Sequence, residues 1–384
     1  MPTERLYYVD PYQTEAEATV LSCEAVKGGW RVILDRTVFY PTGGGQPCDL
    51  GTLGPAGVVD VNEAGGEVVH LCDQPLPVGE AILCKIDWAR RFSLMQQHSG
   101  EHIVSGIIHS RFGYDNVGFH MGSEAITIDY SGEITPQELK ELELAANEAI
   151  WKNVKTEIFY PDADALAMLP YRSKKTLTGV VRIVRFPDLD TCACCGLHVA
   201  RTGEIGLVKL LSVTRFHAGS RIELLCGRQA LAYFGAIYDQ TREISALLSA
   251  KPLQIAVAAA RQKEKLGAAQ YRVTQLENEL FSQKAQALAG KGDVLLFESA
   301  MQPNAVRRLA DAVLSVCGGR CAVFAGTDGA YQYAIGTQQG DLKEFCRAMN
   351  AALQGRGGGK AGFVQGSVSA TRSEIESFFA KEKR

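Results

Sequence analysis

The chain lacks any apolar run that approaches the roughly 20 residues needed to cross a bilayer. Its start, Met-Pro-Thr-Glu-Arg, also lacks the basic and apolar segments of a signal peptide. We therefore expect a cytoplasmic protein with no membrane partner. The chain also has no excess of basic over acidic residues, because its formal net charge is −3. This composition disfavours a nucleic-acid partner, although a local basic face is compatible with an acidic whole.

Cysteine is the residue type whose use needs an explanation. The chain has 11 cysteines, an odd number in a sequence without an export signal. Such usage favours free thiols and metal ligands over a disulfide framework. The hydrophobic and charged fractions, 46% and 22%, are ordinary for a globular protein, and 384 residues suffice for two to four domains.

The pattern of apolar residues changes along the chain and predicts an α+β multidomain protein. Residues 1–87 read as short strands separated by turns, which favours a small β-barrel. Residues 88–230 read as one α+β domain. It starts with a helix over 88–111 capped by Asp87, and a second helix starts at the capping box Thr135-Pro136-Gln137-Glu138.

The second half of the chain is predicted as a helical segment, 231–292, followed by a small α/β domain, 293–384. Apolar residues in the segment 252–289 alternate three- and four-residue steps, as in a heptad seam: Leu266, Ala269, Val273, Leu276 and Leu280. This pattern fits either a long helix packed on its own chain or a dimeric coiled coil. A homodimer through 252–289 is therefore one prediction.

Two pairs of nitrogen and sulfur ligands suggest a zinc site. His98 and His102 are four residues apart on a predicted helix, so both imidazoles leave one face. The run Cys192-Ala193-Cys194-Cys195-Gly196-Leu197-His198 supplies thiols and an imidazole close together. Either element alone is more often structural, but together they favour four-coordinate zinc. The spacing leaves open which of the three cysteines binds.

The same histidine pair also fits a different enzyme class. His98-Ser99-Gly100-Glu101-His102 matches the HxxEH pattern of inverted zinc peptidases, in which Glu101 would act as general base. Such peptidases need a downstream carboxylate ligand and have no need for a Cys-x3-His element, which this sequence supplies. The peptidase is therefore the second interpretation.

Two glycine-rich segments are candidates for ligand contact. In Phe39-Tyr40-Pro41-Thr42-Gly43-Gly44-Gly45-Gln46-Pro47 the glycines permit close approach of a ligand, with Thr42 and Gln46 beside them, although a simple turn is the alternative. The segment Gly355–Ala361 departs from a phosphate-binding loop in spacing and has Ala361 where Ser or Thr would hold magnesium. We exclude an NTPase and expect a loop in which Arg356 and Lys360 contact an anion or RNA.

Taken in order, these motifs resemble the free-standing alanyl-tRNA editing proteins of the AlaX type, in their long form. The resemblance rests on Phe39–Gln46, His98-x3-His102, and Cys194-x3-His198 with its flank Thr202–Gly206. The usual segment reads Cys-Gly-Gly-Thr-His, and here Cys195 and Leu197 replace the first Gly and the Thr. The spacing between the two candidate metal ligands of this segment is the same as in the family, whereas the residues expected to form the pocket wall differ. The segment Gly355–Ser367 resembles the DHH-associated domain that ends alanyl-tRNA synthetases.

The resemblance implies a trans-editing deacylase that releases serine or glycine from mischarged alanine tRNA. It assigns zinc to four ligands: His98, His102, Cys194 and His198. Thr42 is the candidate sensor of the serine hydroxyl, Gln46 and Glu101 are further catalytic candidates, and Gly43–Gly45 would contact the substrate. No segment that could charge tRNA precedes the predicted barrel, so we expect editing alone. A tRNA-binding module with purely structural zinc is a third interpretation.

Overall fold

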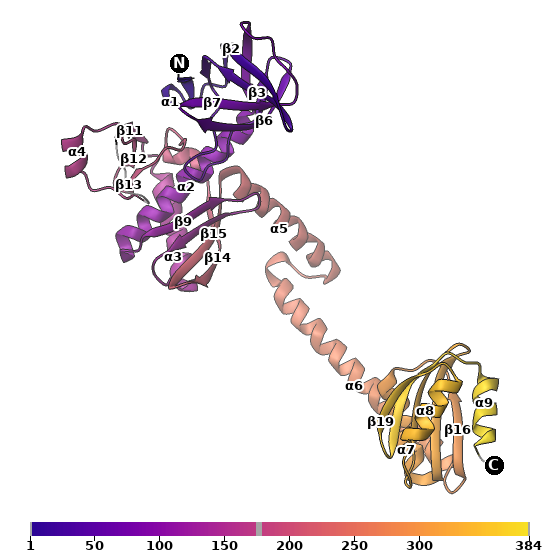
Figure 1. Cartoon of the computed structure of the whole chain (residues 1–384). Coiled ribbons are helices and arrows are strands. Elements are labelled where there is room, and N and C mark those ends of the chain that lie inside the picture. The colour runs from indigo at the N-terminus through magenta and orange to yellow at the C-terminus, as the bar shows by residue number, and fades with distance from the viewer. Residues whose placement is uncertain (1, 174–178, 383–384) are drawn as a thin grey trace. The chain divides into compact units, whose positions relative to one another are not determined.

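The computed structural model describes residues 2–173 and 179–382 and divides into two compact units, Met1–Thr241 and Arg242–Arg384 (Figure 1). Both units mix helices and sheets, which confirms the predicted α+β class. Within the described ranges, no helix combines the length and apolar character that a membrane span requires. The finer division at residues 87, 230 and 292 stays a prediction.

The first unit begins with antiparallel strands that pair in a closed order, β2-β3-β7-β6-β5-β8. Alternate residues of these strands are buried, as in β7, so one face of each strand forms an apolar interior. A short parallel pair, β1 with β4, and the helix α1 lie beside it. The bounds are β1 (Glu4–Arg5), α1 (Leu6–Val9), β2 (Glu15–Val26), β3 (Gly29–Leu34), β4 (Arg36–Thr37), β5 (Gly51–Leu53), β6 (Ala56–Ala64), β7 (Glu67–Cys72) and β8 (Ala81–Ile86).

Helix α2 (Trp88–Phe112) starts where the sequence predicted it. The Asp87 carboxylate accepts a hydrogen bond from the Arg90 amide, and Gly113 ends the helix with φ 72°. The predicted capping box at Thr135 and Glu138 is likewise present, at the start of α3 (Pro136–Trp151). Both helices pack on a sheet of order β14-β15-β10-β9, formed by β9 (Asn116–Met121), β10 (Ile126–Tyr130), β14 (Val208–Phe216) and β15 (Gly219–Cys226).

A second, three-stranded sheet carries the cysteine cluster. Its order is β11-β12-β13, and its third strand ends just before Cys194. The segment that follows leads through η1 to β14 and then to helix α5, most of which is exposed. The bounds are β11 (Glu157–Phe159), α4 (Ala163–Met168), β12 (Ile183–Phe186), β13 (Asp190–Ala193), η1 (Thr202–Ile205) and α5 (Gly227–Leu247).

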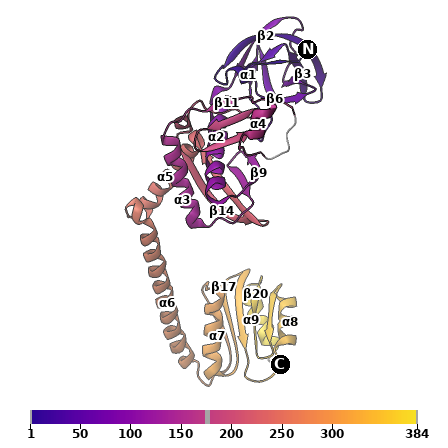
Figure 2. The same ribbon diagram turned by 90° about the vertical axis from the view of Figure 1, so that its left-hand side faces the viewer.

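The second unit is a five-stranded sheet of order β16-β17-β18-β20-β19 with helices on both faces. Helix α7 covers one face, with the end of α6 packed against it, and α8 and α9 cover the other (Figure 2). The bounds are η2 (Pro252–Gln254), α6 (Ile255–Ala287), β16 (Gly292–Glu298), α7 (Pro303–Cys317), β17 (Gly318–Thr327), β18 (Ala330–Gly336), α8 (Lys343–Ala352), β19 (Arg356–Lys360), β20 (Phe363–Val368) and α9 (Arg372–Lys381).

Two features of this unit bear on the sequence-based expectations. The glycine-rich segment predicted as a loop is an edge strand, β19, because its backbone pairs with β20 from Arg356↔Ser367 to Lys360↔Phe363. The end of α6 packs on its own chain, which is one of the two alternatives predicted for 252–289, since Phe281 is buried against α7. The seam residues named above, its alanine apart, are 47–61% exposed in the single chain, so the homodimer stays a prediction.

Candidate metal centre

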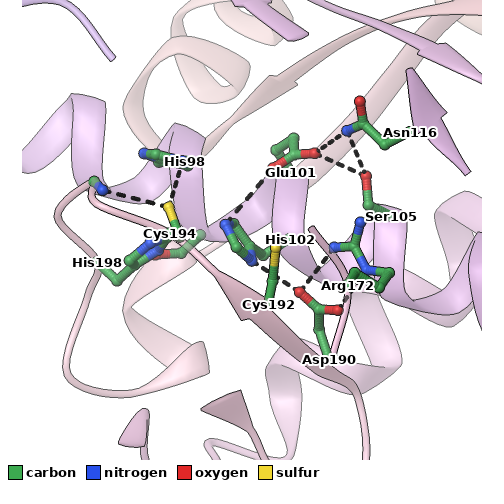
Figure 3. Close-up of polar contacts among 12 residues, drawn as sticks. His98, Glu101, His102, Ser105, Asn116, Arg172, Asp190, Cys192, Cys194 and His198 are labelled. Carbon is green, nitrogen blue, oxygen red and sulfur yellow. Dashed lines mark hydrogen bonds and ion pairs between the residues drawn. The ribbon is translucent and has the colours of Figure 1, made fainter. Parts of the chain in front are cut away.

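The two ligand pairs named from the sequence meet in the structure. His98 and His102 leave one face of α2, and Cys194 and His198 come from the segment after β13 (Figure 3). One donor atom from each of the four side chains lies within 4.8 Å of the others. His98 Nε2 is 3.4 Å from Cys194 Sγ. Two nitrogen and sulfur pairs from separate elements thus converge on one point, as in a zinc site.

Burial supports the assignment of this point to a cation. The three imidazoles are at most 3% exposed. His198 Nε2 is buried, and no hydrogen-bond partner for it is found among the described residues. Buried polar atoms without a partner are rare in folded proteins, and a bound ion is one of the accepted reasons for them. The donor set and this orphaned nitrogen both fit zinc.

The cysteines of the cluster differ in how easily they form a thiolate. Burial would raise the pKa of Cys194, but the charge of His98 and the neighbouring imidazoles bring it well below its ordinary value. Burial instead raises the pKa of Cys192 to about 11, and it also raises the pKa of Cys195. Because the thiolate is the metal-binding form, these environments favour Cys194 as the ligand.

Two of the imidazoles are oriented by neutral side chains. His98 Nδ1 is 2.9 Å from Gln46 Oε1, which also accepts a hydrogen bond from the Leu197 amide. His198 Nδ1 is 3.2 Å from Ser99 Oγ. Each contact leaves the Nε2 atom for a metal. Gln46, a catalytic candidate from the sequence, is fully buried and contacts a candidate ligand instead of lining the adjacent cavity.

The third imidazole contacts an acidic residue that sequence reasoning missed. His102 Nδ1 lies 2.8 Å from Asp190 Oδ2, and Arg172 contacts both oxygens of that carboxylate. Burial alone would raise the pKa of Asp190, but the hydrogen bonds from His102 and Arg172 hold it below its usual range. The only signal in the sequence was proximity to the cysteine cluster, which does not single out one carboxylate.

A cavity of about 380 Å³ opens directly beside these ligands. The glycine-rich segment forms part of its wall through Gly44 and Gly45, which have φ values of 58° and 83°. At Gly45 a side chain would also collide with Phe119, since a Cβ there would lie 2.4 Å from the ring. The lining residues are Gly44, Gly45, His98, Glu101, His102, Phe119, Arg172, Ser173, Cys192, Ala193, Cys194 and Cys195.

Glu101 lines the same cavity and is held by a polar network. It is 2% exposed, and its Oε1 accepts hydrogen bonds from Ser105 Oγ at 2.8 Å and Asn116 Nδ2 at 2.5 Å. Its other oxygen, Oε2, lies 3.9 Å from His102 Nε2. A carboxylate is thereby fixed next to the candidate metal position, where it can accept a proton.

Comparisons with known proteins agree with these motifs. A family model described as the threonyl and alanyl tRNA synthetase second additional domain matches residues 181–223, and one for class II (A) tRNA synthetases matches residues 11–90. The chain is 28% identical to the alanyl-tRNA editing protein AlaX-L of Pyrococcus horikoshii, over 97% of this chain and 96% of the relative. Identity to Aarsd1 of Danio rerio is 27%, over 96% and 95%. Over nearly its whole length, the chain is thus similar to alanyl-tRNA editing proteins.

Relatives outside this editing family are longer. An alanine–tRNA ligase of Methanobrevibacter smithii is 30% identical over 95% of this chain, which corresponds to 44% of the ligase. Among solved structures, the C-Ala domain of the Aquifex aeolicus alanyl-tRNA synthetase aligns with 24% of this chain and 86% of its own, at a TM-score of 0.22 and 21% identity.

The remaining two site candidates from the glycine-rich segment are not among the residues that line the cavity. Thr42 is exposed, and its hydroxyl accepts a hydrogen bond from the Cys48 amide at 3.2 Å. Gly43 pairs with Gln46 in the same turn. Neither Thr42 nor Gly43 is among the residues that line the cavity. Their roles in substrate contact stay predictions.

The structure also bears on the peptidase interpretation and on RNA contact. The HxxEH histidines are joined by Cys194 and His198, while the nearby Asp190 carboxylate contacts His102 Nδ1 and an arginine. This arrangement differs from the two-histidine, one-carboxylate set of such a peptidase. Arg356 and Lys360 are exposed on strand β19 of the second unit. Their contact with RNA stays a prediction.

Proposed function

We propose that this protein is a trans-editing hydrolase that deacylates mischarged alanine tRNA, releasing serine or glycine. One observation carries the proposal. Four nitrogen and sulfur donors converge on one point, three of their residues (His98, His102 and Cys194) line a cavity, and the glycine-rich turn forms part of the same wall. A synthetase pocket sized for alanine rejects a smaller residue or one extra hydroxyl poorly, so a separate hydrolytic site is needed for accurate translation.

Zinc is the cofactor that this donor set fits. His98, His102, Cys194 and His198 would hold it, and four protein ligands are the number found in closed zinc sites. When bound there, zinc supplies either polarisation of the ester carbonyl and its attacking water or an anchor for the aminoacyl end. Four protein ligands fill a tetrahedral zinc site. The first role therefore requires one ligand to be exchanged for water or substrate, whereas the second does not, and the proposal includes both.

Glu101 is the proposed general base. Water adds to the ester carbonyl carbon, and its proton passes to the Glu101 carboxylate. The bond from that carbon to the ribose oxygen of the terminal adenosine then breaks. The proton returns to this oxygen, so the products are a free amino acid and deacylated tRNA. Ser105 and Asn116 hold one carboxylate oxygen in place during these transfers.

Release of serine from seryl-tRNA(Ala) by the purified full chain tests the proposal. We expect turnover that a chelator abolishes and zinc restores, and one zinc per chain by elemental analysis. Cys194→Ser should lose zinc and turnover, whereas Cys192→Ser, a matched thiol 3.6 Å from a backbone oxygen, should keep both. Binding of tRNA without release would favour the non-catalytic module, and cleavage of peptides would favour the peptidase.

Discrimination between serine and alanine is proposed to involve the Thr42 hydroxyl. To sense serine, this hydroxyl must exchange its contact with the Cys48 amide for one with the substrate. Thr42→Val should then lower serine release about tenfold, or about 1.4 kcal/mol in the barrier, and leave slow alanine release unchanged. If both rates fall together, Thr42 only stabilises the turn.

The tRNA body is proposed to contact the second unit through Arg356 and Lys360, which flank exposed glycine backbone on β19. Replacing both with alanine should raise KM for charged tRNA and weaken its salt dependence, with little effect on turnover at saturation. A homodimer through 252–289 is the second proposed association, and a concentration-independent monomer in analytical ultracentrifugation would refute it.

A further inference from the structure

The three candidate imidazole ligands differ in the charge of the group that holds their Nδ1 atoms. Gln46 and Ser99 are neutral, whereas the partner of His102 is the carboxylate of Asp190, at 2.8 Å (Figure 3). This carboxylate is 1% exposed. A buried anion on Nδ1 orients the ring and makes Nε2 a stronger donor, and a neutral amide or hydroxyl does so less strongly.

Asp190 is itself held rigidly by one arginine. Arg172 Nε and Nη2 lie 2.7 and 2.9 Å from its two oxygens, in the parallel geometry that suits guanidinium and carboxylate. The backbone of Arg172 is also attached to β13, because its amide donates to Thr191 and its carbonyl accepts from Ala193. The ion pair and the strand that carries Asp190 therefore move as one piece.

We propose that Asp190 and Arg172 are positioning residues for the metal ligand His102, an inference that rests on the proposed zinc site. His102 and Arg172 engage both oxygens of Asp190, which favours a supporting role for it over the alternative ligand group His102, Asp190 and Cys192. Arg172 also lines the cavity beside the ligands. The pair thus couples one wall of the substrate cavity to the orientation of the metal ligand.

The proposal predicts a graded loss of zinc affinity in the full-length chain. Asp190→Asn retains the shape but replaces the anion, and zinc should bind 10- to 100-fold more weakly, with stoichiometry unchanged. Arg172→Lys keeps a cation but loses the paired geometry, so a smaller loss is expected. Ser99→Ala removes a neutral contact and should lower the affinity less than Asp190→Asn.

The measurement is competition for zinc with a chromophoric chelator, together with the absorption spectrum of the cobalt-substituted proteins and the melting temperature of the metal-free forms. The matched control is Asp129→Asn. It removes a carboxylate charge paired with Arg221 at 2.6 and 2.8 Å, on a strand residue that neither lines the cavity nor belongs to a candidate ligand group, and should leave zinc affinity unchanged. Cobalt spectra of Asp190→Asn and the wild type should show the same thiolate and ligand-field bands.

Three results would overturn the inference. Equal zinc affinity in Asp190→Asn and Asp129→Asn would deny any positioning role. A changed cobalt ligand field in Asp190→Asn would make Asp190 a direct ligand. If Asp190→Asn does not fold, Arg172→Lys decides, and an unchanged affinity there refutes the pair. Wild-type protein that binds no zinc would instead refute the zinc site itself.

Discussion

Gly196→Ala should disable the metal centre without replacing any of its ligands. Gly196 is buried next to the first histidine, and a Cβ built on it lies 2.0 Å from His98 Cε1 and 2.3 Å from Nδ1. Since carbon atoms pack at about 3.5 Å or more, one group must move by about 1.5 Å. The Gly196 backbone is tied down by hydrogen bonds to Cys194 Sγ and from Arg182, so the displacement falls on the imidazole.

The displacement separates His98 from Gln46 and from the other ligands, so we expect zinc affinity to fall at least tenfold, about 1.4 kcal/mol. Chelator competition measures the loss, and serine release at limiting zinc should follow it. The control is Gly267→Ala in α6, where a new Cβ meets nothing within 4 Å. If the Gly196→Ala protein keeps wild-type zinc affinity, this reasoning is refuted. That result would mean that the backbone around residue 196 moves and the His98 imidazole keeps its position.

Three further predictions concern stability and domain roles. Arg91→Met should cost about 3–5 kcal/mol in urea unfolding, because it leaves the fully buried Asp49 carboxylate without its cation, whereas the more exposed Arg221→Met should cost less than about 1 kcal/mol. Burial lowers the pKa of His70 to about 4, so the unfolded chain takes up this proton first as the pH falls below about 6.5. Stability should then drop by about 2 kcal/mol more between pH 7 and 5 in the wild type than in His70→Gln, and parallel pH curves would contradict this. A chain that ends at Thr241, the boundary of the first unit, should keep turnover at saturating tRNA but show a raised KM, and an unchanged KM would argue against tRNA contact by the second unit.

Features encoded within a few residues were predictable from the sequence. Asp87 and the Thr135 capping box fixed the starts of α2 and α3, because a cap bonds to an amide three residues away. The four-residue step from His98 to His102 placed both rings on one helix face, because one turn of an α-helix takes about 3.6 residues. The resemblance to the editing family extended this local reading to the second ligand pair, and relatives that match over 96% of their length bear out the resemblance.

Contacts between distant segments were decided only by the tertiary structure. The sequence gives no distance between Gln46 and His98, 52 positions apart, or between Asp190 and His102, 88 positions apart, yet these contacts orient the candidate ligands. Glycine-rich segments are ambiguous for a related reason. Glycine permits turn and strand alike, so pairing with β20 made Arg356–Lys360 a strand, and local hydrogen bonds left Thr42 outside the cavity wall. Spacing determines which face of an element a side chain leaves, and packing determines what that face meets.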